Sequence, residues 1–316
     1  MSEPDPILLF AGSGSPRLGG AIAQHLGLEL GRSDTRRFSD GNLFVKVDEN
    51  VRGRDVYLIQ STVFPSNDNF MELLFWIDAF KRASARTVTV IMPYFSYAKG
   101  DKKDEPRVSI RARVCADAIE AAGADRVVAM DLHAPQIQGF FRIPVDNLYA
   151  MSVLCDRIEE QGREDLVVVS PDAGYAKQAR RYASILGASV AIADKERKEY
   201  DEVAQVWVVG DVSGRDAVIV DDFTISAGTL VSCADELMRR GARSVFAAVT
   251  HGVFAERSME RLDRSPIDKL IVTDTVENHP VSLSAKVDMV SVAPLFAEAI
   301  ERIHRRRSIS VMFPEF

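Results

Sequence analysis

The sequence predicts an α/β protein made of two tandem domains, each a mostly parallel sheet flanked by helices. Short, continuously apolar segments alternate with amphipathic segments of helical length along nearly the whole chain. Such strands are typical of parallel sheets that helices cover on both faces. The alternation pauses near residue 150 and then restarts, and 316 residues is the length of two ordinary domains. We therefore expect domains at 1–149 and 150–316.

The first domain should open with a buried strand over 7–10 and a helix that starts at Pro16. Ser15 is expected to cap this helix, because serine followed by proline at the first helical position is a common start signal. The other elements expected here are strands at 56–60, 87–94 and 126–133 and helices at 69–83 and 109–123. The glycine cluster in AGSGSPRLGG lacks the dinucleotide-binding spacing, so it is interpreted as the loop after the first strand.

The second domain repeats the pattern with the same alternation of apolar strands and helices. Its expected strands are 166–170, 189–194, 217–222 and 244–252, and its expected helices lie at about 174–187 and 228–241. The last helix of the chain, APLFAEAIERIHRRR, could pack on either domain, and packing back onto the N-terminal domain is one prediction.

Composition narrows the class of protein. The net charge of −7 argues against a general nucleic-acid binder or a membrane-surface protein. The three cysteines are widely separated and none forms a CxxC spacing, so the sequence argues against a disulfide framework or a zinc site. The acidic, proline-containing opening does not look like a signal peptide, and no apolar run approaches the ~20 residues of a membrane span. We expect a cytoplasmic protein with no nucleic-acid partner and no membrane partner.

The stretch VIVDDFTISAGTL, at 218–230, carries the strongest chemical signal. Ligands of open parallel sheets bind beyond the carboxyl ends of the strands, which is where Asp221 and Asp222 are expected. Backbone N–H groups at the start of the following helix, with Gly228 allowing close approach, form an anion cradle. Hydroxyls of Ser226 and Thr229 add donors. Two acids beside such a cradle are expected to bind a phosphorylated sugar, with the acids at its hydroxyls and the loop at its phosphate. The alternative without a function is an N-capped loop with solvated aspartates.

This loop resembles the phosphoribosyl-diphosphate loop of type I phosphoribosyltransferases. Other segments occur in the order known from ribose-phosphate diphosphokinase, also called phosphoribosyl-diphosphate synthetase: FSDG, VRGRDVYLIQS, MELLFWIDAFKRASA, DLHAPQIQGFF, SPDAG and DKERK. The resemblance covers almost the whole chain. It implies two tandem type I phosphoribosyltransferase-like domains and transfer of the diphosphoryl group of ATP to the anomeric hydroxyl of ribose 5-phosphate. The products would be phosphoribosyl diphosphate and AMP, Mg²⁺ would be required, and we expect a homo-oligomer.

The resemblance also implies roles for individual residues. For ribose 5-phosphate it implies Asp221, Asp222, Ile225, Ser226, Ala227, Gly228 and Thr229. For ATP it implies Phe38, Asp40, Gly41, Asn42, Lys99 and Gly100. It implies catalytic roles for Lys195, Arg197 and His133, and metal binding by His133 and Asp172, with Asp131 a weaker candidate on the same side of its strand as His133. Without the resemblance, residues 38–42 would be interpreted as a simple turn and residues 195–197 as a solvated loop.

Five positions, which make four changes at expected ligand contacts, depart from the common form of this family. Ile225 replaces Asp, Ser226 replaces Thr, Asn42 replaces Glu, and Lys99-Gly100 replaces Arg-Gln. Two alternatives therefore stay open: a non-catalytic, synthetase-associated regulatory paralogue, or a phosphoribosyltransferase. The acid pair, the Lys-x-Arg pair, His133 and Asp172 are all retained, which favours a variant active enzyme. The plant-type class II synthetases also lack an acid at the position of Ile225, which supports this interpretation. The departures at 42, 99 and 100 predict relaxed donor choice, with ATP or another nucleoside triphosphate as donor.

Overall fold

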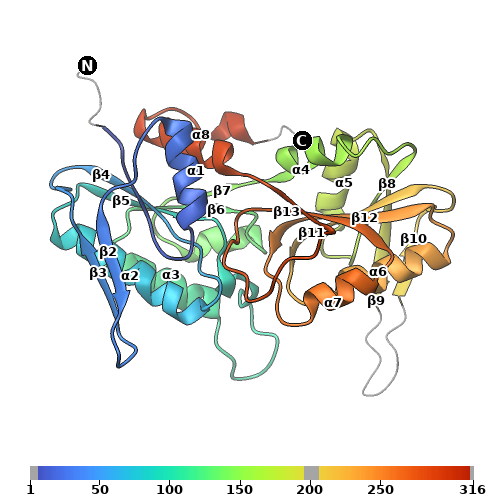
Figure 1. Ribbon diagram of the computed structural model, residues 1–316, viewed down its shortest axis with the longest axis horizontal. Coiled ribbons are helices and arrows are strands. Elements are labelled where there is room, and N and C mark those ends of the chain that lie inside the picture. The colour runs from blue at the N-terminus through green and yellow to red at the C-terminus, as the bar shows by residue number, and fades with distance from the viewer. Residues whose placement is uncertain (1–5, 196–205, 314–316) are drawn as a thin grey trace. The chain divides into compact units, whose positions relative to one another are not determined.

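The computed structural model describes residues 6–195 and 206–313, which divide into two compact units (Figure 1). One unit comprises the described residues up to Tyr149, the short segment Thr275–Asn278 and the described residues from Ser291 onward. The other comprises Ala150–Asp274 and His279–Val290. The chain therefore enters the second unit after Tyr149, returns to the first unit for four residues, and returns to it again for the last helix.

The first unit is built on a five-stranded sheet whose strands are all parallel and follow the order β1-β4-β5-β6-β7. These strands are β1 (Leu8–Ala11), β4 (Asp55–Ile59), β5 (Thr87–Met92), β6 (Arg126–Met130) and β7 (Val145–Leu148). Helices α1 (Pro16–Leu26) and α8 (Ala293–His304) cover one face, and α2 (Ser66–Arg82) and α3 (Arg111–Ala122) cover the other (Figure 1). Single 3₁₀ turns lie at η1 (Ser96–Lys99), η2 (Pro135–Phe140) and η3 (Ser310–Met312). An antiparallel hairpin of β2 (Ser33–Arg37) and β3 (Leu43–Val47) stands apart from the sheet.

The second unit is built on a seven-stranded sheet of order β10-β9-β8-β11-β12-β13-β14, in which only β10 runs antiparallel to its neighbour. The strands are β8 (Leu166–Ser170), β9 (Ser189–Lys195), β10 (Val206–Val209), β11 (Asp216–Thr224), β12 (Ser244–Gly252), β13 (Ile267–Thr273) and β14 (Val287–Val290). Helices α4 (Met151–Glu159) and α5 (Ala176–Ile185) lie on one face, and α6 (Gly228–Arg239) and α7 (Ser258–Arg264) on the other (Figure 1). From β8 the chain proceeds to β9 on one side, whereas β11 lies on the other. The gap between the carboxyl ends of β8 and β11 is therefore the topological switch point, where ligands of such sheets bind.

Most predicted elements are present with small shifts of their bounds, and the ends of β11 and β6 differ in ways that affect the predicted site. β11 continues to Thr224 because β12 keeps pairing with it through the register Thr224↔Gly252, so the acid pair lies inside the strand. β6 ends at Met130, because Asp131 adopts the left-handed region with φ 39°. The prediction that Asp131 and His133 share one side of a strand is therefore wrong, since neither belongs to one.

The start of α1 also differs from the prediction. Ser15 makes no side-chain capping bond, and its Oγ instead accepts the backbone N–H of Ser61 at 2.9 Å. The buried carboxylate of Glu277 accepts the N–H groups of Arg17 and Leu18, at 2.9 and 3.1 Å, and the Nε–H of Arg17 at 2.9 Å. A carboxylate at a helix N-terminus accepts hydrogen bonds from N–H groups that have no partner within the helix, and its negative charge is attracted to the positive end of the helix dipole. The cap of α1 thus comes from a residue 260 positions away along the chain.

Each unit buries its own apolar core against its sheet. In the first, Phe10 of β1 packs between Trp76 and Phe80 of α2, with ring centroids 5.8 and 4.9 Å away. In the second, strands β11 and β12 contribute continuous runs of buried residues, as expected for strands covered on both faces. Within residues 6–195 and 206–313, no helix is long and apolar enough to cross a bilayer.

Candidate functional site

The predicted phosphate loop connects β11 to α6 at the switch point of the second sheet. Ala227, just before the helix, is buried and has φ 58°, a conformation that a residue with a side chain adopts only when its surroundings hold it there. Val231 donates the first intrahelical bond, to the carbonyl of Ala227 at 2.9 Å. The N–H groups before Val231 therefore have no acceptor within the helix, and they are the donors that the sequence predicts for an anion.

The acid pair has an unusual electrostatic environment. Asp222 is buried and Asp221 is half-buried, and the two carboxylates are consecutive. Removal from water, followed by the negative charge of Asp222, raises the pKa of the Asp221 carboxyl well above its usual range, and the charge of Asp172 adds to this shift. Three carboxylates thus influence one another across the switch point. Such an arrangement favours a hydrogen-bonding or cationic ligand that relieves the repulsion.

Asp172 lies in the loop after β8, on the other side of the switch point. One oxygen of its exposed carboxylate accepts the N–H of Tyr175, at 2.9 Å, next to the start of α5. Its carbonyl accepts the hydroxyl of Ser170 at 2.6 Å. The position beyond a strand end agrees with the prediction. His133 is exposed and follows β6 in the first unit, so the two predicted metal ligands belong to different units.

Arg261 contacts the predicted phosphate loop, and no motif in the sequence pointed to it. Its Nη1 donates to the carbonyl of Ser226 at 3.2 Å and lies 3.7 Å from where a Cβ on Gly228 would be. The guanidinium therefore lies over the phosphate loop and adds positive charge there. The loop is further held by the N–H of Ala255, which donates to the carbonyl of Ile225 at 2.8 Å. Sequence spacing gave no signal, because 35 residues separate Arg261 from Ser226.

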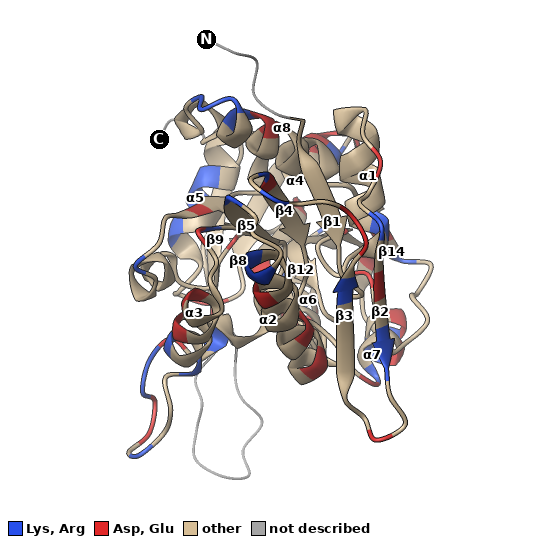
Figure 2. Ribbon diagram, turned by 90° about the vertical axis from the view of Figure 1, so that its left-hand side faces the viewer, with Lys and Arg blue, Asp and Glu red and all other residues tan. Residues whose placement is uncertain are grey.

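The predicted ATP hairpin is formed by β2, β3 and the turn between them. β2 ends in Arg36 and Arg37, whereas β3 carries a single basic residue, Lys46, near its end (Figure 2). Phe38 is 48 % exposed, and its ring contacts Phe44 edge-on with centroids 5.8 Å apart. Asn42 donates its backbone N–H and its side-chain Nδ2 to the carboxylate of Asp40, at 3.0 and 2.7 Å. These two bonds, the backbone one first, lower the pKa of Asp40. The side chain of Asn42 is thus directed within the hairpin, to Asp40.

The other predicted ATP residues follow the carboxyl end of β5. Lys99 ends η1 and is half-buried, and Gly100 is buried immediately after it. Gly100 donates its N–H to Tyr97 at 2.9 Å and accepts the N–H of Ala112 at 3.1 Å. The segment is therefore fixed against the start of α3.

Two catalytic predictions fall at the edge of what the structure describes. The backbone of Lys195 ends β9, the strand next to β8. The side chain of Lys195 and the whole of Arg197 lie outside the described residues. Within the described ranges, no group of three or more His, Cys, Asp or Glu side chains has the arrangement of a metal site.

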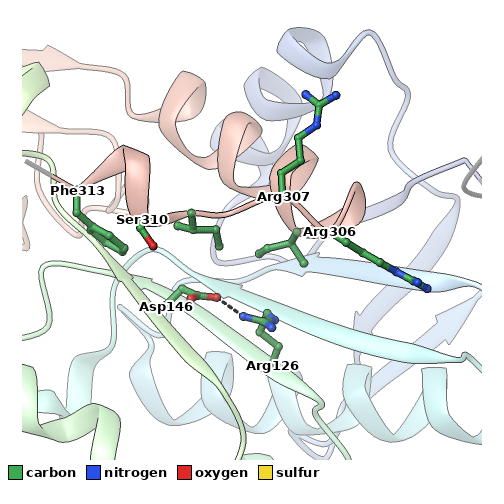
Figure 3. Close-up of a pocket in the computed structure, with 8 residues that line it drawn as sticks. Arg126, Asp146, Arg306, Arg307, Ser310 and Phe313 are labelled. Carbon is green, nitrogen blue, oxygen red and sulfur yellow. Dashed lines mark hydrogen bonds and ion pairs between the residues drawn. The ribbon is translucent and has the colours of Figure 1, made fainter.

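A separate pocket of about 370 Å³ lies elsewhere in the first unit (Figure 3). It is lined by Arg126, Asp146, Ile303, Arg306, Arg307, Ile309, Ser310 and Phe313. Arg126 is the first residue of β6 and pairs with Asp146 across to β7. This pocket therefore lies toward the amino ends of the strands, away from the edge that carries the predicted residues.

A parallel sheet with an acid pair, an anion cradle and a left-handed loop at its switch point defines a phosphoribosyltransferase-like protein. The family is given by the comparisons with known proteins. A family model described as the N-terminal domain of ribose phosphate pyrophosphokinase matches residues 7–123, and one described as a phosphoribosyl synthetase-associated domain matches residues 201–314. The chain belongs to the ribose-phosphate pyrophosphokinase family.

Individual relatives match over nearly their whole length. Ribose-phosphate pyrophosphokinase of Caldanaerobacter subterraneus subsp. tengcongensis is 47 % identical over 97 % of this chain and 98 % of its own. That of Wolinella succinogenes is 44 % identical over 96 % of this chain and 98 % of its own. The crystal structure of phosphoribosylpyrophosphate synthetase from Mycobacterium smegmatis superposes with a TM-score of 0.90, at 38 % identity, over 96 % of this chain and all of that one. The predicted family and the predicted pair of phosphoribosyltransferase-like domains are confirmed.

Proposed function

We propose that this protein is an active ribose-phosphate diphosphokinase, which transfers the diphosphoryl group of ATP to the anomeric hydroxyl of ribose 5-phosphate. The observation that supports this most is the acid pair beside the left-handed loop of Ala227 at the switch point, in a chain of this family. Asp221 and Asp222 would hold the sugar hydroxyls, and the start of α6 would hold the phosphate. Incubation with ATP, Mg²⁺ and ribose 5-phosphate should yield AMP. Absence of AMP, with ribose 5-phosphate still bound, would favour the non-catalytic regulator instead.

We propose Mg²⁺ as the cofactor, with His133 and Asp172 as its predicted ligands and carboxylates of the second unit as further oxygen donors. Magnesium prefers oxygen ligands and usually binds one or two carboxylates together with substrate phosphates. Asp172 and Asp221 offer carboxylate oxygens that would need substrate phosphates to complete a metal site, because the described residues form no such site by themselves. A cation would also oppose the negative charges of Asp222 and Asp172 that, after burial, raise the pKa of Asp221. When bound, the ion would neutralise charge on the transferred diphosphoryl group.

The acid pair gives a direct test of the sugar site. Asp221→Asn and Asp222→Asn should each weaken ribose 5-phosphate binding about ten- to a hundredfold, because each removes a charged hydrogen-bond acceptor. Ile225→Asp should leave turnover intact, since the diol is held by the surviving pair. Calorimetric titration measures the affinities. Asp216→Asn is the matched control, because Asp216 lies at the other end of the same strand and pairs with Arg243. Unchanged affinity in both acid-pair variants would refute the assignment.

The donor site gives a second test. The side chain of Asn42 is hydrogen-bonded to the carboxylate of Asp40, and Gly100 has no side chain. Neither position therefore offers a free polar side chain that could select a base. Strict base selection depends on buried polar groups that the wrong base leaves unpaired, and it separates substrates by ~10⁴. We therefore expect GTP to be used within about tenfold of ATP. In keeping with the class II resemblance, activity should need no added inorganic phosphate and should resist ADP. Use of ATP alone, with no activity without phosphate, would contradict this.

Further properties follow from the proposed function rather than from any contact in the structure. We place the enzyme in the cytoplasm, where its three buried, unbridged cysteines would stay reduced. We also propose that it forms a homo-oligomer, which sedimentation of the purified protein would measure. Ribose 5-phosphate and ATP, or another nucleoside triphosphate, would be its only substrates, with no nucleic acid or membrane involved.

A further inference from the structure

Position 100 is filled by a side chain that comes from elsewhere in the chain. Gly100 has φ −93°, a conformation open to any residue, so its backbone does not require glycine. A Cβ built on Gly100 would lie 2.5 Å from Nε, 2.9 Å from Cβ and 3.3 Å from Cζ of Arg111. At these distances a side chain at position 100 would have to displace that of Arg111, so the arginine occupies this space because residue 100 is glycine.

Arg111 is placed there by the start of α3. It is the first residue of the helix, and Ala112 next to it donates its N–H to the carbonyl of Gly100 at 3.1 Å. This bond fixes the helix start against the end of η1, so the guanidinium lies over the backbone just after Lys99. Two cationic side chains thus follow the carboxyl end of β5, the edge where a parallel sheet binds its ligands.

The guanidinium of Arg111 has no hydrogen-bond or ion-pair partner among residues 6–195 and 206–313. The side chain of Arg111 is exposed. By contrast, Arg113 on the same helix pairs with Asp117 and donates to the carbonyl of Phe140. Burial raises the pKa of the Tyr97 phenol, and the positive charge of Arg111 opposes this shift. The hydroxyl of Tyr97 donates its hydrogen bond to Asn67 and not to Arg111. The N–H donors of the Arg111 guanidinium are therefore available to a ligand.

We propose that Arg111 binds the polyphosphate chain of the donor nucleotide, from the space that a side chain at position 100 would otherwise fill. A guanidinium binds phosphate oxygens through two parallel N–H···O bonds, whereas the ammonium of Lys99 acts as a point charge. The Gly100–Arg111 pair thus restores a planar donor at a place where the local sequence, Lys99-Gly100, shows none. Because this fork binds phosphate, it holds the donor without selecting its base. The inference rests on the proposed function and specifies its donor site.

The test is a double-mutant cycle on the full-length protein, read by calorimetric titration with ATP, GTP and inorganic tripolyphosphate. Arg111→Ala should weaken all three by the same factor, about tenfold or more, and leave the affinity for ribose 5-phosphate unchanged. Arg111→Lys should recover only part of the loss. Gly100→Ala should displace the guanidinium and weaken ATP similarly, and the double variant should be no weaker than Arg111→Ala alone.

Arg82→Ala is the matched control, because Arg82 is an exposed arginine of the same unit at the far end of α2, paired with Asp78. It should bind ATP as the wild type does. Wild-type affinity in Arg111→Ala, or unequal losses for ATP and GTP, would overturn the inference.

If Gly100→Ala does not fold, the two Arg111 variants still test the inference. A wild type that binds ATP but makes no AMP refutes the proposed function while the titrations still test Arg111. A wild type that binds none of the three ligands refutes both.

Discussion

Replacing Lys195 by alanine should lower kcat by about a hundred- to a thousandfold while the affinity for ribose 5-phosphate changes little. Attack of the anomeric hydroxyl on the β-phosphorus of ATP spreads negative charge over the diphosphoryl oxygens and the departing AMP. A cation that contacts this charge only in the transition state contributes to kcat and not to ground-state binding. Loss of one such contact typically costs ~10²–10³ in rate.

The backbone supports this assignment for Lys195. β9 ends at Lys195 and pairs in parallel with β8, through the register Ser170↔Ile192. The carboxyl end of β9 therefore points to the same edge of the sheet as the loop that carries Asp172. Arg197 would add a second cation to the cluster.

Single-turnover and steady-state kinetics, with titration of ribose 5-phosphate, measure the effect of Lys195→Ala. Lys269→Ala serves as the control, since Lys269 lies near the start of β13, at the amino-terminal edge, with its ammonium 3.6 Å from Asp288. Near-normal turnover in Lys195→Ala would remove Lys195 from the mechanism. An equal loss in both variants would indicate a general effect on folding.

Replacing Glu277 by alanine should lower the free energy of unfolding by about 2–3 kcal/mol, a larger loss than Arg17→Ala should cause. The carboxylate is buried and accepts the N–H groups of Arg17 and Leu18 together with Nε of Arg17. Without it, two backbone donors at the start of α1 lose their acceptor, and the positive end of the helix dipole loses its counter-charge.

Urea unfolding, followed by the fluorescence of buried Trp76 in a Trp207→Phe background, reports on the first unit selectively. Arg17→Ala is the control, because the Arg17 side chain is 77 % exposed and its loss should cost less than about 1 kcal/mol. If Glu277→Ala is no less stable than Arg17→Ala, the carboxylate does not cap α1.

The sequence predicted most clearly those features that depend on short-range pattern. Strands 166–170 and 244–252 were predicted with their observed bounds, because both are continuous apolar runs bounded by polar residues. The loop from Asp221 to Thr229 was found because its acids, small residues and helix start are consecutive. Edge strands such as β7 and β14 were missed, since each is four residues long and only partly apolar.

Contacts between residues that are far apart in the sequence could not be predicted from local sequence pattern. Ser15 had the residue type of a cap, yet Glu277 performs that role through contacts made only in the folded chain. Arg261 reaches the phosphate loop from the next helix, and Arg111 fills the space at Gly100 from eleven positions away. The departure Lys99-Gly100 looked like a simple loss of donors because the compensating arginine is not adjacent in sequence.

The division of the first unit among three stretches of chain has a consequence for biosynthesis. Thr275–Asn278, with the cap residue Glu277, and helix α8 both belong to the unit that begins at the N-terminus. Domains usually fold in the order in which the ribosome releases them. Here the N-terminal unit lacks part of its structure until the last helix has left the exit tunnel, whereas the second unit is complete once Val290 has emerged. The half that is translated first is therefore the half that finishes folding last, and its nascent form must remain soluble without α8 throughout translation of the other.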